Sequence, residues 1–269
     1  MPHLRAAALH VIFSSMKPIT YDSDVAPVLF IADLHLDPSR PEAIATFLDY
    51  LQTHARQAAA LFIVGDLFES WIGDDAYPSA DPIAPALKAL AAQGTDIWLM
   101  HGNRDFLMGK TFAQAAGATL LDEPARINID GRPVLVEHGD ALCTDDRAYQ
   151  AFRAQVRDPA WQAQFLALPI AERFAQAQAA RTRSGEDMAG KTATIMDVNH
   201  DAVQQRISDH AVTHLVHGHT HRPGVHTLTL EAATAQRFVL GDWFEQGSVL
   251  VIDHGDWQLQ SLPLIAKPR

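Results

Sequence analysis

The sequence predicts an α/β fold, a four-layer αββα sandwich of two mixed sheets with a helical insertion. In the first half, short uncharged runs at residues 28–32, 61–64 and 97–100 alternate with helical patterns, which favours parallel strands. In the second half, alternating segments and an Asp130-Gly131 turn favour antiparallel hairpins. Between the last two groups of strands, residues 144–210 lack strand character. We therefore assign residues 27–269 to one domain with a helical insert at about 144–210, and residues 1–26 to a non-core N-terminal extension.

The first half reads as consecutive strand–helix–strand units. After the strand at 28–32, Pro41 opens a helix whose apolar residues Ile44, Phe47, Leu48 and Leu51 fall on one face. The strand at 61–64 follows, and this unit predicts a parallel pair with a right-handed crossover. A loop rich in acids at 67–81, a helix at about 82–93 that stops at Gly94, the strand at 97–100 and a helix at 110–116 complete this half.

The second half begins with a hairpin whose strands are residues 126–129 and 132–137. The insert then shows two apolar sets at helical spacing. One set is Tyr149, Phe152 and Val156, and the other is Trp161, Phe165, Leu166, Ile170 and Phe174. The sheet resumes at 214–216, and further strands are expected at 225–230, 238–240, 248–253 and 257–262.

Composition narrows the classes of function. The net charge of −11 argues against a nucleic-acid-binding surface. The one cysteine, Cys143, excludes an intrachain disulfide and a zinc site made of thiolates. No run approaches the roughly 20 apolar residues of a membrane-spanning helix. Residues 4–13 are apolar, but His10 interrupts them and no small-residue cleavage site follows, so an extension is favoured over a signal peptide.

Side chains that ligate metals follow five of the predicted strands, where α/β sheets build their sites. They are Asp33, His35, Asp66, Asn103, His138, His219 and His221. In an extended chain, Asp33 and His35 point to the same side, and so do the two last histidines. Singly, each residue has an ordinary explanation, such as a helix cap for Asp or Asn and a hydrogen bond for His. Together, seven oxygen and nitrogen ligands suit two ions that share one bridging carboxylate, with Asp66 as the bridge.

The order Asp-x-His, Gly-Asp, Gly-Asn-Arg-Asp, His, Gly-His-x-His resembles the signature of the calcineurin-like metallophosphoesterases over residues 33–221. The segments 31–36, 65–75, 101–107, 138–146 and 195–199 resemble those members that act on UDP-2,3-diacylglucosamine in lipid A biosynthesis. This closer resemblance covers the chain from about residue 27 to its end. It implies two Mn²⁺ ions per chain. One would be held by Asp33, His35, Asp66 and His221, and the other by Asp66, Asn103, His138 and His219.

The resemblance also implies a reaction. Metal-activated water would attack the α-phosphorus of UDP-2,3-diacylglucosamine, giving UMP and 2,3-diacylglucosamine 1-phosphate. Arg104 would hold the phosphate, and Asp66, Asn103, Arg104 and His138 form the implied catalytic set. Met188 stands where the family usually has Asn, so one substrate hydrogen bond is lost or comes from the backbone. The implied substrate contacts are Asn103, Arg104, Asp146, Ser184, Met188, Lys191 and His219.

The insert offers a place for acyl chains and for a membrane. Residues 144–191 hold seven basic and six acidic side chains, so the segment is near neutral within an acidic protein. With Trp161, Phe165, Leu166 and Phe174, it predicts peripheral contact with the cytoplasmic face of the bacterial inner membrane. The same residues are equally consistent with ordinary helical core. Neither a nucleic acid nor an obligate protein partner is expected.

Two other classes of function stay open. One is a metallophosphoesterase acting on a soluble nucleotide or a phosphoprotein, against which the apolar insert argues. The other is a non-catalytic scaffold on the same fold. Such scaffolds generally lose ligands, whereas all seven positions carry ligating residues here.

Overall fold

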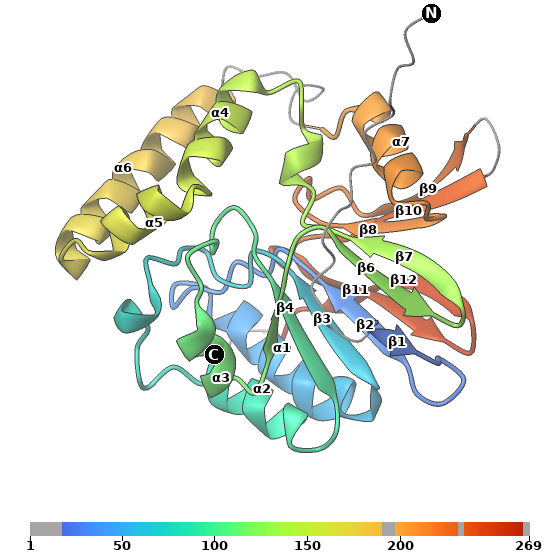
Figure 1. Cartoon of the computed structure of the whole chain (residues 1–269). Coiled ribbons are helices and arrows are strands. Elements are labelled where there is room, and N and C mark those ends of the chain that lie inside the picture. Colours follow the sequence, from blue (N-terminus) through green and yellow to red (C-terminus); the bar gives the residue numbers. More distant parts are fainter. Residues whose placement is uncertain (1–17, 190–196, 231–233, 266–269) are drawn as a thin grey trace, which may run out of the picture.

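The computed structural model describes residues 18–189, 197–230 and 234–265. Two six-stranded mixed sheets stack face to face with helices on both outer sides (Figure 1). This arrangement confirms the predicted αββα sandwich. Short 3₁₀ helices occupy the connections at Ala55–Gln57, Asp74–Ala76 and Asp140–Leu142.

The first sheet has the order β12-β11-β2-β3-β4-β5. Its parallel part is β2 (Val28–Ile31), β3 (Ala60–Val64), β4 (Asp96–Met100) and β5 (Thr119–Leu121). The hairpin of β11 (Gln246–Asp253) and β12 (Asp256–Pro263) joins β2 antiparallel. Three helices cover the outer face, α1 (Pro41–Thr53), α2 (Ile83–Ala91) and α3 (Lys110–Ala115). The predicted apolar face of α1 packs inward, because Phe47 and Leu51 are buried in the core beneath these helices.

The second sheet has the order β1-β6-β7-β8-β10-β9. The predicted hairpin is β6 (Ala125–Ile129) and β7 (Arg132–Val136). Next to it, β8 (His214–His217) pairs parallel with β7 and with β10 (Thr234–Val239), and β9 (Gly224–Thr229) closes the edge antiparallel. Helix α7 (His200–Asp209) covers the outer face of this sheet.

Strand β1 (Thr20–Tyr21) lies within the segment assigned to a non-core extension. It pairs parallel with β6, and the Tyr21 hydroxyl donates to Asp96 and accepts from Trp98, both on β4 of the other sheet. The sandwich therefore begins before residue 27. Two residues are too few to show strand periodicity, which is why the sequence pattern missed this strand. Residues 1–17 lie outside the described residues.

The core between the sheets consists of the inward side chains of both. Phe30 and Phe62 stack with ring centroids 4.6 Å apart, and they face Ile127, Val136 and Phe238 of the second sheet. All five side chains are buried. Since the sheets are fixed on each other by this core, the loops at the carboxyl ends of β2, β3, β4, β7 and β8 are held at one edge.

The predicted helical insert contains α4 (Arg147–Val156), α5 (Pro159–Leu166) and α6 (Ile170–Ala189), which lie together to one side of the sandwich (Figure 1). Of its apolar side chains, Val156 and Phe165 are buried. The second apolar set does not form one buried face, because α5 ends at Leu166 and a turn separates it from α6. Phe152, Leu166, Ile170 and Phe174 are 44%, 38%, 45% and 54% exposed.

Four arginines of the insert bind the rest of the domain. Arg153 pairs with Asp140 and Glu123, and Arg157 donates to the Gly102 carbonyl. Arg173 binds the Asp75 carboxylate and the Ile72 carbonyl, and Arg181 binds Glu69. These four of the seven basic side chains are therefore held by contacts with the core of the domain.

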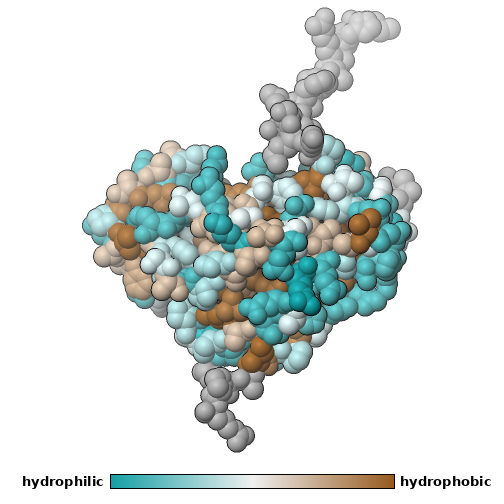
Figure 2. All heavy atoms as spheres, turned by 90° about the horizontal axis from the view of Figure 1, so that it is seen from below, coloured by the Kyte–Doolittle hydropathy of each residue, from teal (hydrophilic) through white to brown (hydrophobic). Residues whose placement is uncertain are grey.

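On the face shown in Figure 2, hydrophobic side chains form separate patches among hydrophilic ones. None of the helices in the described parts of the chain has the length and apolar character needed to cross a bilayer.

Candidate metal centre

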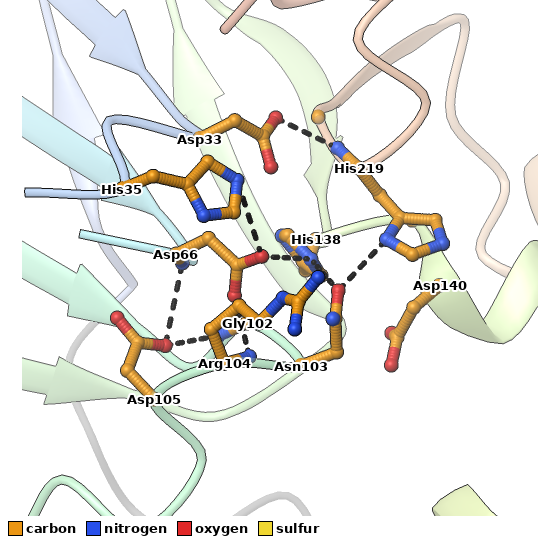
Figure 3. A network of polar contacts seen from close by, with 12 residues as sticks. Asp33, His35, Asp66, Gly102, Asn103, Arg104, Asp105, His138, Asp140 and His219 are labelled. Carbon is orange, nitrogen blue, oxygen red and sulfur yellow. Dashed lines mark hydrogen bonds and ion pairs between the residues drawn. The ribbon is translucent and has the colours of Figure 1, made fainter. Parts of the chain in front are cut away.

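All seven side chains predicted as ligands lie together at one edge of the sandwich. Figure 3 labels six of them, and His221 lies beside Asp33 and His35. Asp33 and His35 follow β2, Asp66 follows β3, and Asn103 follows β4. The remaining three are histidines of the second sheet, His138 after β7 and His219 and His221 after β8. The cluster therefore joins both sheets, although 188 positions separate its first and last members.

One half of the cluster is built from Asp33, His35 and His221. The Nε2 atoms of the two imidazoles lie 3.2 Å apart, and the Nε2 atom of His221 lies 3.5 Å from Oδ1 of Asp33. That carboxylate oxygen is buried and accepts no hydrogen bond, whereas Oδ2 accepts from the His219 backbone N–H at 2.8 Å. A buried, unpartnered carboxylate oxygen facing two imidazole nitrogens fits a divalent cation.

The other half of the cluster converges on the side-chain oxygen of Asn103. This oxygen lies 3.0 Å from Nε2 of His138 and 2.9 Å from Nδ1 of His219. The other ring nitrogen of His138 lies 3.0 Å from the Val64 carbonyl oxygen, so Nδ1 carries a proton and Nε2 is the atom that faces the cluster.

Asp66 lies between the halves. Its Oδ2 atom is 3.7 Å from Nε2 of His35 and 3.7 Å from Nε2 of His138, one imidazole from each half. Its Oδ1 atom accepts from the Arg104 backbone N–H at 2.8 Å. The equal distances place one carboxylate oxygen where two cations could share it, as expected of a bridging ligand.

The backbone of the cluster is left-handed at Asp33, His35, Asp66, His219 and His221, with φ between 48° and 69°. Such conformations are uncommon for residues other than glycine and cost roughly 1–3 kcal/mol each. Asp33 and His35 do converge, as expected. The expected cause, the alternation of side chains along an extended strand, was wrong. Tight left-handed turns aim these side chains at the cluster instead.

Two neighbouring glycines are required by close approach. A Cβ atom on Gly102 would lie 2.0 Å from Oδ1 of Asp66, and one on Gly218 would lie 2.4 Å from Oδ2 of Asp33. Both distances are far inside van der Waals contact. The Gly-Asn and Gly-His pairs of the sequence therefore reflect backbone packed directly against ligand carboxylates.

The electrostatics of the cluster indicate a need for positive charge. Burial raises the pKa of Asp66 to about 6, against the influence of His138 and His35. Burial alone would lower the pKa of His138, but Asp66 and Asp33 raise it to about 9. Burial alone would also lower the pKa of His221, but the nearby carboxylates of Asp242 and Asp33 raise it to about 10. Without cations, protons on these imidazoles compensate the buried carboxylates, and divalent cations would replace them.

Three acidic residues that were not predicted as part of the site support the cluster. Asp105 is fully buried and accepts from the backbone N–H groups of Asp66, Leu67 and Gly102. Glu69 lies 2.8 Å from Nδ1 of His35, and Asp242 lies 3.3 Å from Nδ1 of His221. Asp105 closes the Gly-Asn-Arg-Asp motif, which could have identified it, whereas no sequence signal connects Asp242 to a histidine 21 positions away.

The predicted substrate contacts outside the cluster do not all lie at the cavity or within the described residues. Arg104 lines a cavity next to Asn103. Asp146 caps helix α4 by accepting from the Tyr149 backbone N–H, which is the ordinary role of such a residue. Ser184 and Met188 belong to α6, but their side chains lie outside the described residues, as does the whole of Lys191.

The cavity has a volume of about 630 Å³ and extends from the cluster to the insert. Glu69, Asn103 and Arg104 form its polar end beside the cluster, and Gln155, Gln176, Arg181 and Arg183 of the insert also line it. Its wall continues over apolar and aromatic side chains of the insert and the facing loop, including Trp71, Phe106, Tyr149, Phe152, Val156, Trp161 and Phe165. Charged groups at one end and a wall rich in aromatic side chains suit a ligand with a charged head and a hydrocarbon part.

Comparison with known proteins finds a family model and relatives that match most of the chain. The family model described as calcineurin-like phosphoesterase matches residues 26–223. The UDP-2,3-diacylglucosamine hydrolase of Stenotrophomonas maltophilia strain K279a is 52% identical over 242 residues, which is 87% of this chain and 98% of that protein. The protein of the same name from Xanthomonas oryzae pv. oryzae strain PXO99A is 50% identical over 245 residues, 88% of this chain and 99% of its own. Among solved structures, an archaeal phosphodiesterase aligns over 88% of this chain and 99% of its own, at 10% identity and a TM-score of 0.45.

The family match covers well over half of the chain, and the two relatives align over nearly their whole length. The chain therefore belongs to the calcineurin-like phosphoesterases, metal-dependent hydrolases, and within them to the family of the UDP-2,3-diacylglucosamine hydrolases.

Proposed function

We propose that the protein hydrolyses the pyrophosphate bond of UDP-2,3-diacylglucosamine and releases UMP and 2,3-diacylglucosamine 1-phosphate. The observation that carries this proposal is the cavity that joins the candidate metal centre to the apolar side of the insert. A soluble nucleotide or a phosphoprotein has no hydrocarbon part to fill the apolar side of this cavity.

In this proposal, two Mn²⁺ ions occupy the centre. Asp33, His35, Asp66 and His221 hold one, and Asp66, Asn103, His138 and His219 hold the other. Mixed carboxylate, amide and imidazole ligands without a thiolate are compatible with manganese. When bound, two divalent cations neutralise charge on the phosphoryl oxygens and lower the pKa of a coordinated water.

The residues of the chain orient the reacting groups. Water attacks the α-phosphorus in line with the bond to the bridging oxygen, so the new oxygen ends on UMP. Arg104 stands at the polar end of the cavity, where its planar guanidinium can donate two hydrogen bonds to phosphoryl oxygens. The leaving group is a phosphate monoester, which is stable as an anion, so the site needs no strong general acid.

The insert supplies binding energy far from the reacting phosphorus. Each CH₂ group of an acyl chain buried against the cavity wall contributes about 0.8 kcal/mol. Trp161 and Phe165 stack at 5.0 Å between centroids and form part of this wall, and Trp161 also packs near Phe106. Phe165 is buried, so its replacement would also disturb folding. Phe152 lines the cavity and is 44% exposed, which makes it the better probe.

We expect Phe152→Ser to lower kcat/KM for the diacylated nucleotide in detergent micelles by about tenfold, because two CH₂ contacts are worth about 1.6 kcal/mol. Hydrolysis of bis(p-nitrophenyl) phosphate should stay within about twofold, since the metal centre and Arg104 are untouched. Phe174→Ser is the matched control, because Phe174 is similarly exposed and does not line the cavity. Equal loss of both activities in folded Phe152→Ser would show that the insert is structural and would contradict the lipid substrate.

We also propose that the protein contacts the cytoplasmic face of the bacterial inner membrane as a peripheral protein. Leu166, Ile170 and Phe174, at the junction of α5 and α6, are exposed and apolar and support this contact. Replacing all three by Ser should then reduce co-flotation with phosphatidylglycerol-containing vesicles at least about fivefold and leave turnover in micelles unchanged. Undiminished flotation of the triple variant would contradict this docking surface.

A further inference from the structure

Glu69 occupies a position between the candidate metal centre and the helical insert. It follows β3 in the same loop as Asp66, and its side chain is 18% exposed. One carboxylate oxygen, Oε2, lies 2.8 Å from Nδ1 of His35. The other, Oε1, binds the guanidinium of Arg181, which belongs to α6. A single carboxylate therefore contacts both a candidate ligand and the insert.

The contact with His35 determines which ring nitrogen faces the centre. A carboxylate beside Nδ1 stabilises the proton on that nitrogen and leaves the lone pair on Nε2. Nε2 is the atom that faces His221 at 3.2 Å and Asp66 at 3.7 Å. The imidazole of His35 is only 3% exposed, so water cannot replace Glu69 as the partner of Nδ1 without rearrangement.

The contact with Arg181 restrains Glu69 from the other side. Arg181 is 42% exposed and lines the cavity together with Glu69. About two turns earlier on the same helix, Arg173 is 2% exposed. Its guanidinium binds the loop at Asp75 and Ile72. Helix α6 is thus fixed at two points to the loop that carries Glu69. A shift of α6 toward or away from the sandwich would change the support of Glu69.

We propose that Glu69 is a positioning residue that couples the helical insert to the metal centre. Its carboxylate holds His35 in the ligating tautomer and orientation, and Arg181 of α6 holds the carboxylate. The proposal rests on the ligand role of His35 in the proposed function. Because energetic coupling between two sites is reciprocal, a cation at the His35 half of the centre also stabilises the docked position of α6.

The test is a Mn²⁺ titration of metal-free protein, followed by the electron paramagnetic resonance signal of free Mn²⁺. We expect Glu69→Gln to weaken one of two sites by about 10–100-fold and the other by less than about threefold. Arg181→Ala should weaken the same site by about two- to fivefold, the effect of an exposed ion pair, and Arg181→Lys should restore most of that loss. In the Glu69→Gln background, Arg181→Ala should have no further effect. Arg132→Ala, an exposed arginine at the β6–β7 turn, is the charge-matched control.

Hydrogen exchange of α6 supplies a second measurement that does not depend on turnover. Saturating Mn²⁺ should slow exchange of backbone amides in residues 170–183 of the wild type and should have little effect on them in Glu69→Gln. If the wild type binds two Mn²⁺ ions and Glu69→Gln binds both with the same affinity, the coupling is overturned. The proposed function is not affected by that result. Equal weakening of both sites, or additive losses in the double variant, would also overturn it. Wild-type protein that binds no Mn²⁺ would overturn the coupling and the proposed function together.

Discussion

Asp66→Asn should reduce kcat at least about 10³-fold and should lower the metal content of the purified protein from two ions to one or none. The substitution is nearly isosteric. The side-chain oxygen can still accept from the Arg104 backbone N–H at the position of Oδ1. The amide NH₂ then occupies the position of Oδ2, 3.7 Å from Nε2 of both His35 and His138, where it cannot ligate a cation. Both halves of the centre lose a ligand in one change.

The control for this variant is Asp201→Asn, which removes the same charge from the exposed first turn of α7. It should retain full activity and two metal ions. His35→Ala should lose less metal than Asp66→Asn, because it removes a ligand from one half only. Wild-type metal content in folded Asp66→Asn would contradict the bridging role.

Removal of metal should lower the turnover of the lipid nucleotide at least about 10³-fold. Added Mn²⁺ should restore turnover better than Zn²⁺. The protein should remain folded without metal, because protons on His138 and His221 compensate the buried carboxylates. Its thermal midpoint should nevertheless fall, since a ligand at 100 times its Kd stabilises the folded state by about 2.7 kcal/mol.

The measurement combines activity, metal analysis and thermal unfolding of one dialysed sample. Dialysis without chelator is the control and should leave both ions in place. Full turnover in excess chelator, with metal shown to be absent, would contradict a metal-dependent reaction. Loss of activity together with loss of the folded signal would instead contradict the compensation by protons.

The strands that carry the site could be predicted because they are long apolar runs in a sheet buried on both faces. β2 and β3 are buried along their whole length, and every residue in their sequences is apolar. β1 and β5 have two and three residues and depend on neighbours for their pairing, so local pattern did not reveal them. The pairing of β8 with β7 and β10 also joins segments far apart in the chain, which only the folded sandwich specifies.

The cluster could be predicted because its residues end strands, but its geometry could not. Left-handed turns at Asp33 and His35 replace the extended chain that the spacing suggested. Contacts between distant segments, such as Asp242 with His221, depend on how the last strands pack. For the insert, helical spacing indicated which residues share a face and not whether that face is covered. Phe165 is buried and Phe174 is 54% exposed, although both belonged to one predicted set.

The most direct test of the account is product analysis of purified protein with Mn²⁺ and UDP-2,3-diacylglucosamine in ¹⁸O-labelled water. The account predicts UMP carrying one ¹⁸O atom and unlabelled 2,3-diacylglucosamine 1-phosphate, because water attacks the α-phosphorus and the lipid phosphate leaves with the bridging oxygen. Label on the lipid phosphate, or an intact lipid nucleotide after incubation with fully metal-loaded protein, would contradict it.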